Sequence, residues 1–328
     1  MPTPVSHDYS ELLHYTTMNG LRGIIESGCM WASNAAWLND SSEITHFFDV
    51  RLSALIEHEA RNYAYELARE PEKLERMVRE GGVQKIIAKE TAVLTSILRR
   101  ATLEMNQPFV LSLSGPRDEK VRSNGLLSQW RGYGQDGGYA IVFDTVQLEE
   151  LLKREAESHH YTHVQIGDVY YHGIDDAIQP ATPDVAEYDS LVRLGVSRII
   201  RGGTAAETER FYEAVTSLSC LCKHWGFWEE REVRVVVVPA STEIMHAAEK
   251  APPPKEIKAF TRGESRVPYV ELFAPTSGSS GSKRLPIKRI IVGPHRNRDA
   301  HAQQVQELLL NSGYTAEVVQ SEIPYIGR

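Results

Sequence analysis

The clearest strand in the sequence runs from Glu232 to Val238 and contains four consecutive valines. It is the most apolar stretch of the chain, yet Arg234 interrupts it. It is also far shorter than the roughly 18 apolar residues of a membrane span. No apolar run in the sequence reaches that length, so we expect a protein without a membrane-spanning segment.

The remaining segments favour an α+β fold, because strand and helix patterns are mixed without regular alternation. Residues 43–106 have a highly charged helical pattern, which we interpret as a helical insertion. We therefore expect a single domain over residues 1–328 with residues 43–106 inserted into it. Further strands are predicted at 30–33, 109–114, 139–143, 164–171, 285–292 and 316–320, and further helices at 125–134, 146–158, 186–200, 205–223 and 300–311.

Charge and cysteine content restrict the partners and the compartment. The chain has 36 Lys and Arg residues against 44 Asp and Glu, a net charge of −8, which argues against broad electrostatic adhesion to nucleic acid or an anionic membrane. Three cysteines in 328 residues make no disulfide framework and favour a reducing compartment. The first residues lack the basic and apolar regions of a signal peptide. We expect a cytoplasmic protein.

The first candidate motif is His14-Tyr15-Thr16, at the end of a predicted strand and just before a helix. A neutral imidazole offers one hydrogen-bond donor and one acceptor, which suits a ribose hydroxyl or an amide. The simpler interpretation is a surface histidine beside an amphipathic helix.

The second candidate motif pairs the strand that carries Ser112 and Ser114 with the short helix that carries Trp130 and Tyr133. The two aromatic residues are three apart, so they share a helix face and could form a stacking wall for a planar heterocycle such as nicotinamide. Aromatic pairs at this spacing more often pack in a core.

The third candidate motif is the acidic run before the valine-rich strand. Glu230, Glu232 and Arg234 are two residues apart in turn, so on a strand their side chains share a face. Paired carboxylates can divide the work of glycosidic bond cleavage, with one stabilising an oxocarbenium-like cation and the other orienting an acceptor. The alternative is a solvated acidic strand edge paired with neighbouring arginines.

Two histidine-containing clusters have the residue types of metal ligands but not the spacing of a known metal site. Cys220, Cys222 and His224 lack a fourth ligand at a recognisable spacing. A second group, His159, His160 and His163, lacks the pattern of a zinc protease helix. We predict no metal site.

The order of the three motifs resembles that of ADP-ribosyltransferases of the His-Tyr-Glu kind. The segment LLHYTTMNGLRGIIESGCMW is similar to their first motif, FVLSLS with the following aromatic helix to their second, and EEREVR to their third. The chain as a whole resembles a bacterial family of unknown function, through HYT, the stretch from Trp31 to Glu43, the SQWRGY helix and the run from Lys223 to Arg234.

The resemblance implies a split-sheet core and NAD as the substrate. His14, Tyr15 and Thr16 would hold the ribose and amide of the nicotinamide nucleoside. Ser112, Ser114, Trp130 and Tyr133 would form the second wall, with the two aromatic rings stacking on the nicotinamide.

For the chemistry, the resemblance implies that Glu232 binds ribose hydroxyls and stabilises the oxocarbenium-like transition state, while Glu230 serves the acceptor. By analogy, the enzyme would be a toxin or phage-defence effector that transfers ADP-ribose to a macromolecule, protein or nucleic acid, and would have a neutralising antitoxin partner. Two alternatives stay open. One is a non-catalytic nucleotide-binding module on the same fold, and the other is RNA 2′-phosphate transfer to NAD, for which Arg131 and Arg234 are the candidate phosphate ligands.

Overall fold

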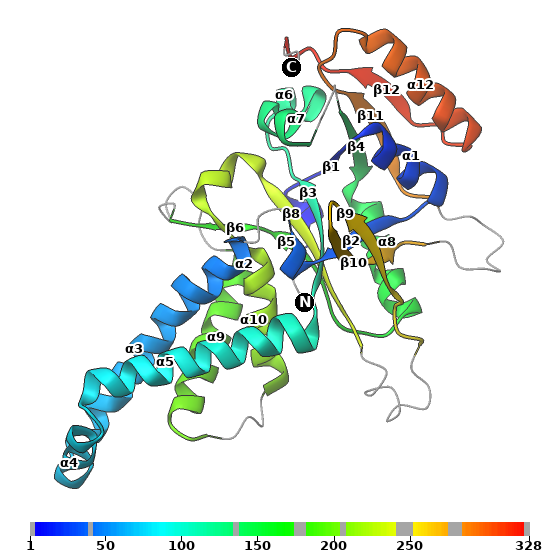
Figure 1. Cartoon of the computed structure of the whole chain (residues 1–328). Helices are drawn as coiled ribbons and strands as arrows, with labels where there is room; N and C mark the ends of the chain where they lie inside the picture. The colour runs from blue at the N-terminus through cyan, green and yellow to red at the C-terminus, as the bar shows by residue number, and fades with distance from the viewer. Residues whose placement is uncertain are drawn as a thin grey trace. The chain divides into compact units, whose positions relative to one another are not determined.

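The computed structural model describes residues 4–38, 42–133, 138–173, 182–203, 208–240, 252–274 and 284–324. It contains 54% helix and 26% strand, and its large sheet is mixed, so the chain combines both classes of structure as the sequence indicates. The chain divides into two compact units (Figure 1). The sheet unit comprises Met1–Ser33, Phe109–Val169 and Gly226–Arg328; the helical unit comprises Asn34–Pro108 and Tyr170–Trp225.

The sheet unit is built around one ten-stranded sheet. Its main path has the order β12-β11-β4-β1-β3-β2-β10-β9, and β8 lies between β3 and β5 off this path. The strands are β1 (Glu11–Thr16), β2 (Met30–Asn34), β3 (Phe109–Ser114), β4 (Tyr139–Asp144), β5 (Tyr161–Asp168), β8 (Glu232–Pro239), β9 (Ile257–Arg262), β10 (Ser265–Leu272), β11 (Ile287–Val292) and β12 (Glu317–Gln320). Strand β1 is antiparallel to β3 and β4, β8 to β3 and β5, β10 to β2 and β9, and β11 to β4, whereas β11 and β12 are parallel.

Helices and short turns of the sheet unit connect these strands. They are η1 (Val5–His7), α1 (Met18–Ser27), α6 (Glu119–Asn124), α7 (Leu127–Tyr133), α8 (Thr145–Ser158) and α12 (Arg298–Asn311), with η6 (Trp225–Glu230) leading into β8. Helix α1 begins where the Thr17 hydroxyl accepts a hydrogen bond from the Gly20 N–H, and it ends at Gly28 with a φ of 68°.

The sheet buries apolar side chains on both faces, which explains why its central strands have few polar positions. In β1, Leu12 packs into the large core with Ile141 and Phe143, whereas Leu13 and Tyr15 pack into a smaller core on the other face. This follows from the two-residue period of a strand. Near-continuous apolar strands are therefore required here.

The helical unit consists mainly of antiparallel helices. Its elements are η2 (Ala35–Trp37), α2 (Ser42–His46), η3 (Phe47–Leu52), α3 (Ser53–Leu67), α4 (Pro71–Arg79), α5 (Val83–Arg100), η4 (Ala101–Asn106), α9 (Pro183–Ile200) and α10 (Thr208–Leu221), with the two short strands β6 (Tyr170–His172) and β7 (Cys222–His224). Helices α3 and α5 pack along each other, and α9 packs on α10. The predicted insertion at 43–106 lies within this unit, which also takes in 170–225.

Two strand predictions need correction. The single strand predicted at 164–171 is two strands, because β5 pairs with β8 whereas β6 pairs with β7 in the other unit. The hairpin of β9 and β10 was not predicted, since its sequence alternates charged and apolar residues and includes Pro268. Proline is tolerated there because Pro268 pairs only with Ala259 of β9, and the pairing of β10 with β2 begins one residue later, at Tyr269.

Gly125 gives a test of how tightly the α6–α7 turn is packed. It ends α6 with a φ of 73°, and an added Cβ would lie 2.5 Å from the Trp130 ring. Gly125→Ala is expected to lower the free energy of unfolding by about 2–4 kcal/mol, from backbone strain and the clash together. Gly132→Ala in α7, where a Cβ meets no described atom within 4 Å, is the matched control and should be neutral or slightly stabilising. Equal effects in urea unfolding would contradict this packing.

The pKa of the Glu11 carboxyl leads to a prediction of how the stability of the sheet unit depends on pH. Burial alone would raise the pKa of its carboxyl, but hydrogen bonds and charge from Arg289 and Lys288 outweigh burial and lower the pKa to about 2. A lowered folded-state pKa stabilises the fold above the unfolded value, near 4.5, and this stabilisation is lost as the pH falls toward 2. Urea unfolding between pH 5 and pH 2 should therefore show a steeper pH dependence in the wild type than in Glu11→Gln. An unchanged slope in the variant would refute the assignment.

Candidate functional site

Strand β3 is the element that connects the predicted site residues. It has three neighbours, β1, β2 and β8, although a strand has only two edges, so β1 and β2 must share one of them. Strand β1 pairs with β3 at Leu13↔Ser114 alone, whereas it stays paired with β4 as far as Thr16↔Tyr139. The sheet therefore forks where β1 leaves β3.

His14 occupies this fork. Its Nδ1 lies 3.0 Å from the Ser112 carbonyl oxygen. This contact links the imidazole of β1 to the backbone of β3 just beyond the last pair, Leu13↔Ser114, that the two strands share. Burial lowers the pKa of His14, although the hydrogen bond to Ser112 partly opposes this. A carbonyl only accepts, so Nδ1 carries the proton of the neutral ring and Nε2 is the acceptor.

The structure corrects the expectation that Trp130 stacks on a ligand. Trp130 is only 2% exposed, and its ring packs edge-on against Tyr15 with the centroids 4.9 Å apart. Its Nε1–H donates to the Asn124 carbonyl at 3.0 Å. The Tyr15 hydroxyl accepts from the Leu126 N–H at 2.8 Å, and burial raises the pKa of that hydroxyl. Both rings thus fasten α7 to β1 as core residues.

Thr16 and Tyr133 are more accessible than this aromatic pair. Thr16 is half-buried at the end of β1, and its Oγ1 lies close to Gly20 of α1, where a Cβ would be 2.0 Å away. Tyr133 ends α7 and is 40% exposed. Of the predicted aromatic wall, only Tyr133 presents its ring to solvent.

Glu232 and Arg234 form a buried ion pair at the start of β8. The Arg234 Nε lies 2.7 Å from Glu232 Oε1, and its Nη2 lies 2.9 Å from Oε2. Glu232 is 6% exposed and Arg234 2%. The shared strand face predicted for these residues is what allows the two-point contact. The interpretation as a solvated acidic edge is therefore wrong for this pair.

The backbone around Glu230 is fixed by several hydrogen bonds. The buried Ser114 hydroxyl donates to the Glu230 carbonyl at 2.8 Å, and the Gly115 N–H donates to the Arg231 carbonyl at 2.7 Å. Arg231 has a φ of 45°, an uncommon conformation for a residue with a side chain, and its guanidinium lies over the Trp228 ring. Glu230 itself is half-buried. This corner joins the predicted residues Ser114, Glu230 and Glu232.

A polar cluster that the sequence did not reveal lies at the same end of the sheet. Asp168, which ends β5, hydrogen-bonds to Tyr9, whose hydroxyl also accepts from Arg117 at 3.3 Å. Burial raises the pKa of Asp168, against the lowering effect of Tyr9 and Arg117. Each residue is isolated in the sequence, so no spacing rule finds the cluster; only the register Asp168↔Val233 brings it near β8.

The described residues contain no group of three or more His, Cys, Asp or Glu side chains arranged to hold a metal ion. Cys220 and Cys222 are both buried. In the helical unit, His224 lies beside His46 and His172, whose rings stack with centroids 4.4 Å apart. In the sheet unit, His159 contacts Glu155 at 3.3 Å.

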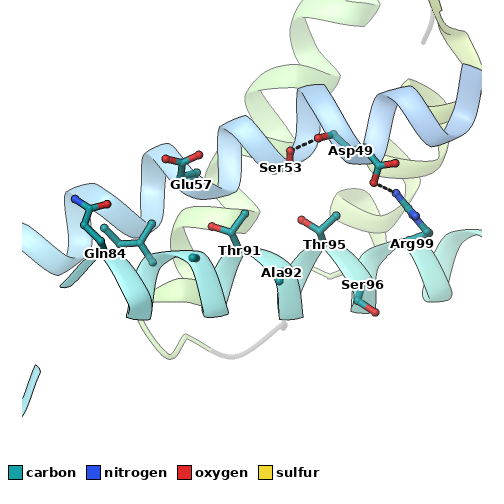
Figure 2. Close-up of a pocket in the computed structure, with 11 residues that line it drawn as sticks. Asp49, Ser53, Glu57, Gln84, Thr91, Ala92, Thr95, Ser96 and Arg99 are labelled. Carbon is teal, nitrogen blue, oxygen red and sulfur yellow. Dashed lines mark hydrogen bonds and ion pairs between the residues drawn. The ribbon is translucent and has the colours of Figure 1, made fainter. Parts of the chain in front are cut away.

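The helical unit contains a groove of about 560 Å³ between α3 and α5 (Figure 2). Thr91 and Thr95 point between the two helices, and both hydroxyl oxygens are buried without a partner in the described part of the chain. Asp49 and Arg99 form an ion pair at one end. None of the predicted site residues lines this groove.

Comparison with known proteins adds one finding. A domain of unknown function, DUF2971, is found at residues 129–235. The DUF2971 stretch runs from α7 through the first part of β8 and includes Trp130, Tyr133, Glu230, Glu232 and Arg234. It excludes His14 and β3. No match was found among curated proteins or solved structures. No helix in the described ranges is long and apolar enough to cross a membrane.

The buried ion pair of the DUF2971 stretch can be tested by stability. Arg234→Met leaves the Glu232 carboxylate buried without its guanidinium partner and is expected to cost about 3–5 kcal/mol in the free energy of unfolding. Adding Glu232→Leu should restore most of that loss. The control is Lys153→Met, which breaks an exposed pair with Glu150 and should change little. Equal losses for the two single variants would contradict the assignment.

Proposed function

We propose that this chain is an NAD-dependent ADP-ribosyltransferase, which cleaves the nicotinamide glycosidic bond and transfers ADP-ribose to a macromolecule. The observation that carries the proposal is His14 in the fork between β1 and β3, held by the Ser112 carbonyl. A split sheet with a histidine at the fork agrees with the core implied by the motif order. The proposal uses no metal.

His14 is suited to bind ribose because its protonation is fixed by its surroundings. The lowered pKa keeps the ring neutral near pH 7, and Nδ1 donates to Ser112, so Nε2 accepts a hydrogen bond from a ribose hydroxyl. Thr16 and the exposed Ser112 hydroxyl are the nearby polar groups for the amide. Tyr133 is the ring proposed to stack on the nicotinamide; Tyr15 supports α7 beneath it.

Glu232 is proposed to stabilise the cation formed on the ribose. As the C1′–N bond breaks, its electron pair leaves with nicotinamide, and the ribose gains oxocarbenium character. A carboxylate held in place by Arg234 supplies a negative charge that needs no reorganisation. The acceptor nucleophile then bonds to C1′ and gives up its proton, a step for which Glu230 is the proposed base.

A second candidate function is a nucleotide-binding module without catalysis. It is favoured by the state of Glu232, which is 6% exposed with both oxygens bound to Arg234. In that case His14 and Tyr133 would still bind the nicotinamide nucleoside. The two functions differ in one measurable property, which is turnover of bound NAD.

The test follows nicotinamide release by chromatography from the purified chain with NAD, with and without cell extract. Glu232→Gln is expected to lower the rate by about 10²–10³-fold because it removes the charge that stabilises the transition state. His14→Ala should mainly raise KM. Glu229→Gln, an exposed carboxylate of the same acidic run, is the control and should behave as wild type.

Each outcome decides between the candidates. Release that persists in Glu232→Gln would refute the role of Glu232. An NAD-dependent rise in melting temperature without release in any extract would support the binding module. If NAD changes neither quantity, the proposed function is wrong.

A further inference from the structure

Three aromatic side chains gather on one face of the sheet unit, one from each of three neighbouring strands. They are Trp31 of β2, Tyr269 of β10 and Phe260 of β9, which lie side by side in the sheet (Figure 1). The registers Glu271↔Trp31 and Val267↔Phe260 place all three rings on the same face. We call this surface the aromatic face.

The rings are in contact and differ in exposure. The Trp31 and Tyr269 centroids are 4.1 Å apart, Trp31 and Phe260 5.5 Å, and Phe260 and Tyr269 5.8 Å. Trp31 is 47% exposed, whereas Tyr269 beneath it is 7% exposed. Tyr269 therefore fixes the orientation of the outer indole. The opposite face of these strands is buried in the core through Met30, Ala32, Val270 and Leu272.

The charge of this region differs in sign from that of the whole chain. The hairpin at 257–272 contains three cations, Lys258, Arg262 and Arg266, against two carboxylates, whereas the chain carries a net charge of −8. Lys258 pairs with Glu271 at 2.8 Å. Arg262 and Arg266 are exposed next to the hairpin turn, and Arg262 shares the aromatic face with Phe260.

We propose that the aromatic face binds single-stranded nucleic acid, with bases stacked on Trp31 and Phe260 and a phosphate near Arg262. Stacking on aromatic rings of a sheet face accepts every base, because each base has a π-face, and flanking cations hold the backbone. The net negative charge of the chain disfavours long duplexes, so the stacking rings supply most of the affinity. This inference rests on β2, β9 and β10 and does not depend on NAD chemistry.

The experiment measures fluorescence anisotropy of a labelled oligo(dT) or oligo(rU) of about 12 nucleotides, titrated with the full chain at about 50 mM salt. Trp31→Ala and Phe260→Ala are each expected to weaken binding about tenfold. Arg262→Ala should weaken binding and reduce its salt dependence. The matched control is Trp37→Ala, which removes a tryptophan of similar exposure, 40%, in the helical unit and should bind as wild type.

The measurement on the wild-type chain can overturn the proposal by itself, so the test does not depend on whether the variants fold. No anisotropy change with either strand at micromolar chain would overturn the proposal, and so would binding that Trp31→Ala, Phe260→Ala and Arg262→Ala all leave intact. NAD turnover by Trp31→Ala is expected to equal that of the wild type. Failure of strand binding is thereby separated from failure of the proposed enzyme activity.

Discussion

The sheet unit depends on how β3 divides one edge between β1 and β2. Once Leu13 has paired with Ser114, β1 diverges, and the backbone groups of β3 beyond that point need another partner. His14 supplies it by hydrogen-bonding to the Ser112 carbonyl. The same divergence lets β1 continue along β4 to Thr16, where Tyr15 can meet Trp130. The divergence of β1 from β3 thus creates the histidine site and places Tyr15 where α7 packs against it.

The opposite edge of β3 pairs with β8, which carries the buried ion pair of Glu232 with Arg234. Arg234 and Glu232 are both buried, and each lowers the cost of burying the charge of the other. Their contact holds both side chains at the start of β8, whose residues from Val235 to Val238 are all valine. The adjacent corner, with Arg231 in the left-handed region and Ser114 bound to Glu230, holds the chain where β8 begins. The two halves of the candidate site are therefore held by different contacts, a histidine–backbone hydrogen bond on one side and an ion pair on the other.

Sequence patterns located strands that contain a clear apolar run, and they failed where charged and apolar residues alternate, as in β9 and β10, or where distant residues decide. Strands β3, β4 and β8 were predicted because their apolar runs are unambiguous. The β9–β10 hairpin was missed because one of its faces is aromatic and charged. Periodicity placed Trp130 and Tyr133 on one side of the helix. It could not predict that Tyr15, from another element, packs against Trp130 and leaves Tyr133 more exposed. Tyr9 precedes β1, Arg117 follows β3 and Asp168 ends β5, so only the tertiary fold brings them together, which no local pattern encodes.

The chain passes between its two units four times, near residues 33, 108, 169 and 225. Every residue of the helical unit has therefore been synthesised by residue 225. In contrast, Glu11 of β1 pairs with Lys288 and Arg289, which are synthesised much later. Arg289 lies 278 positions after Glu11 in the sequence. At about 5–20 residues per second, ribosomal synthesis takes on the order of 15–55 s to cover that interval. The unit that contains the beginning of the described chain is thus the last to acquire its full set of contacts during translation.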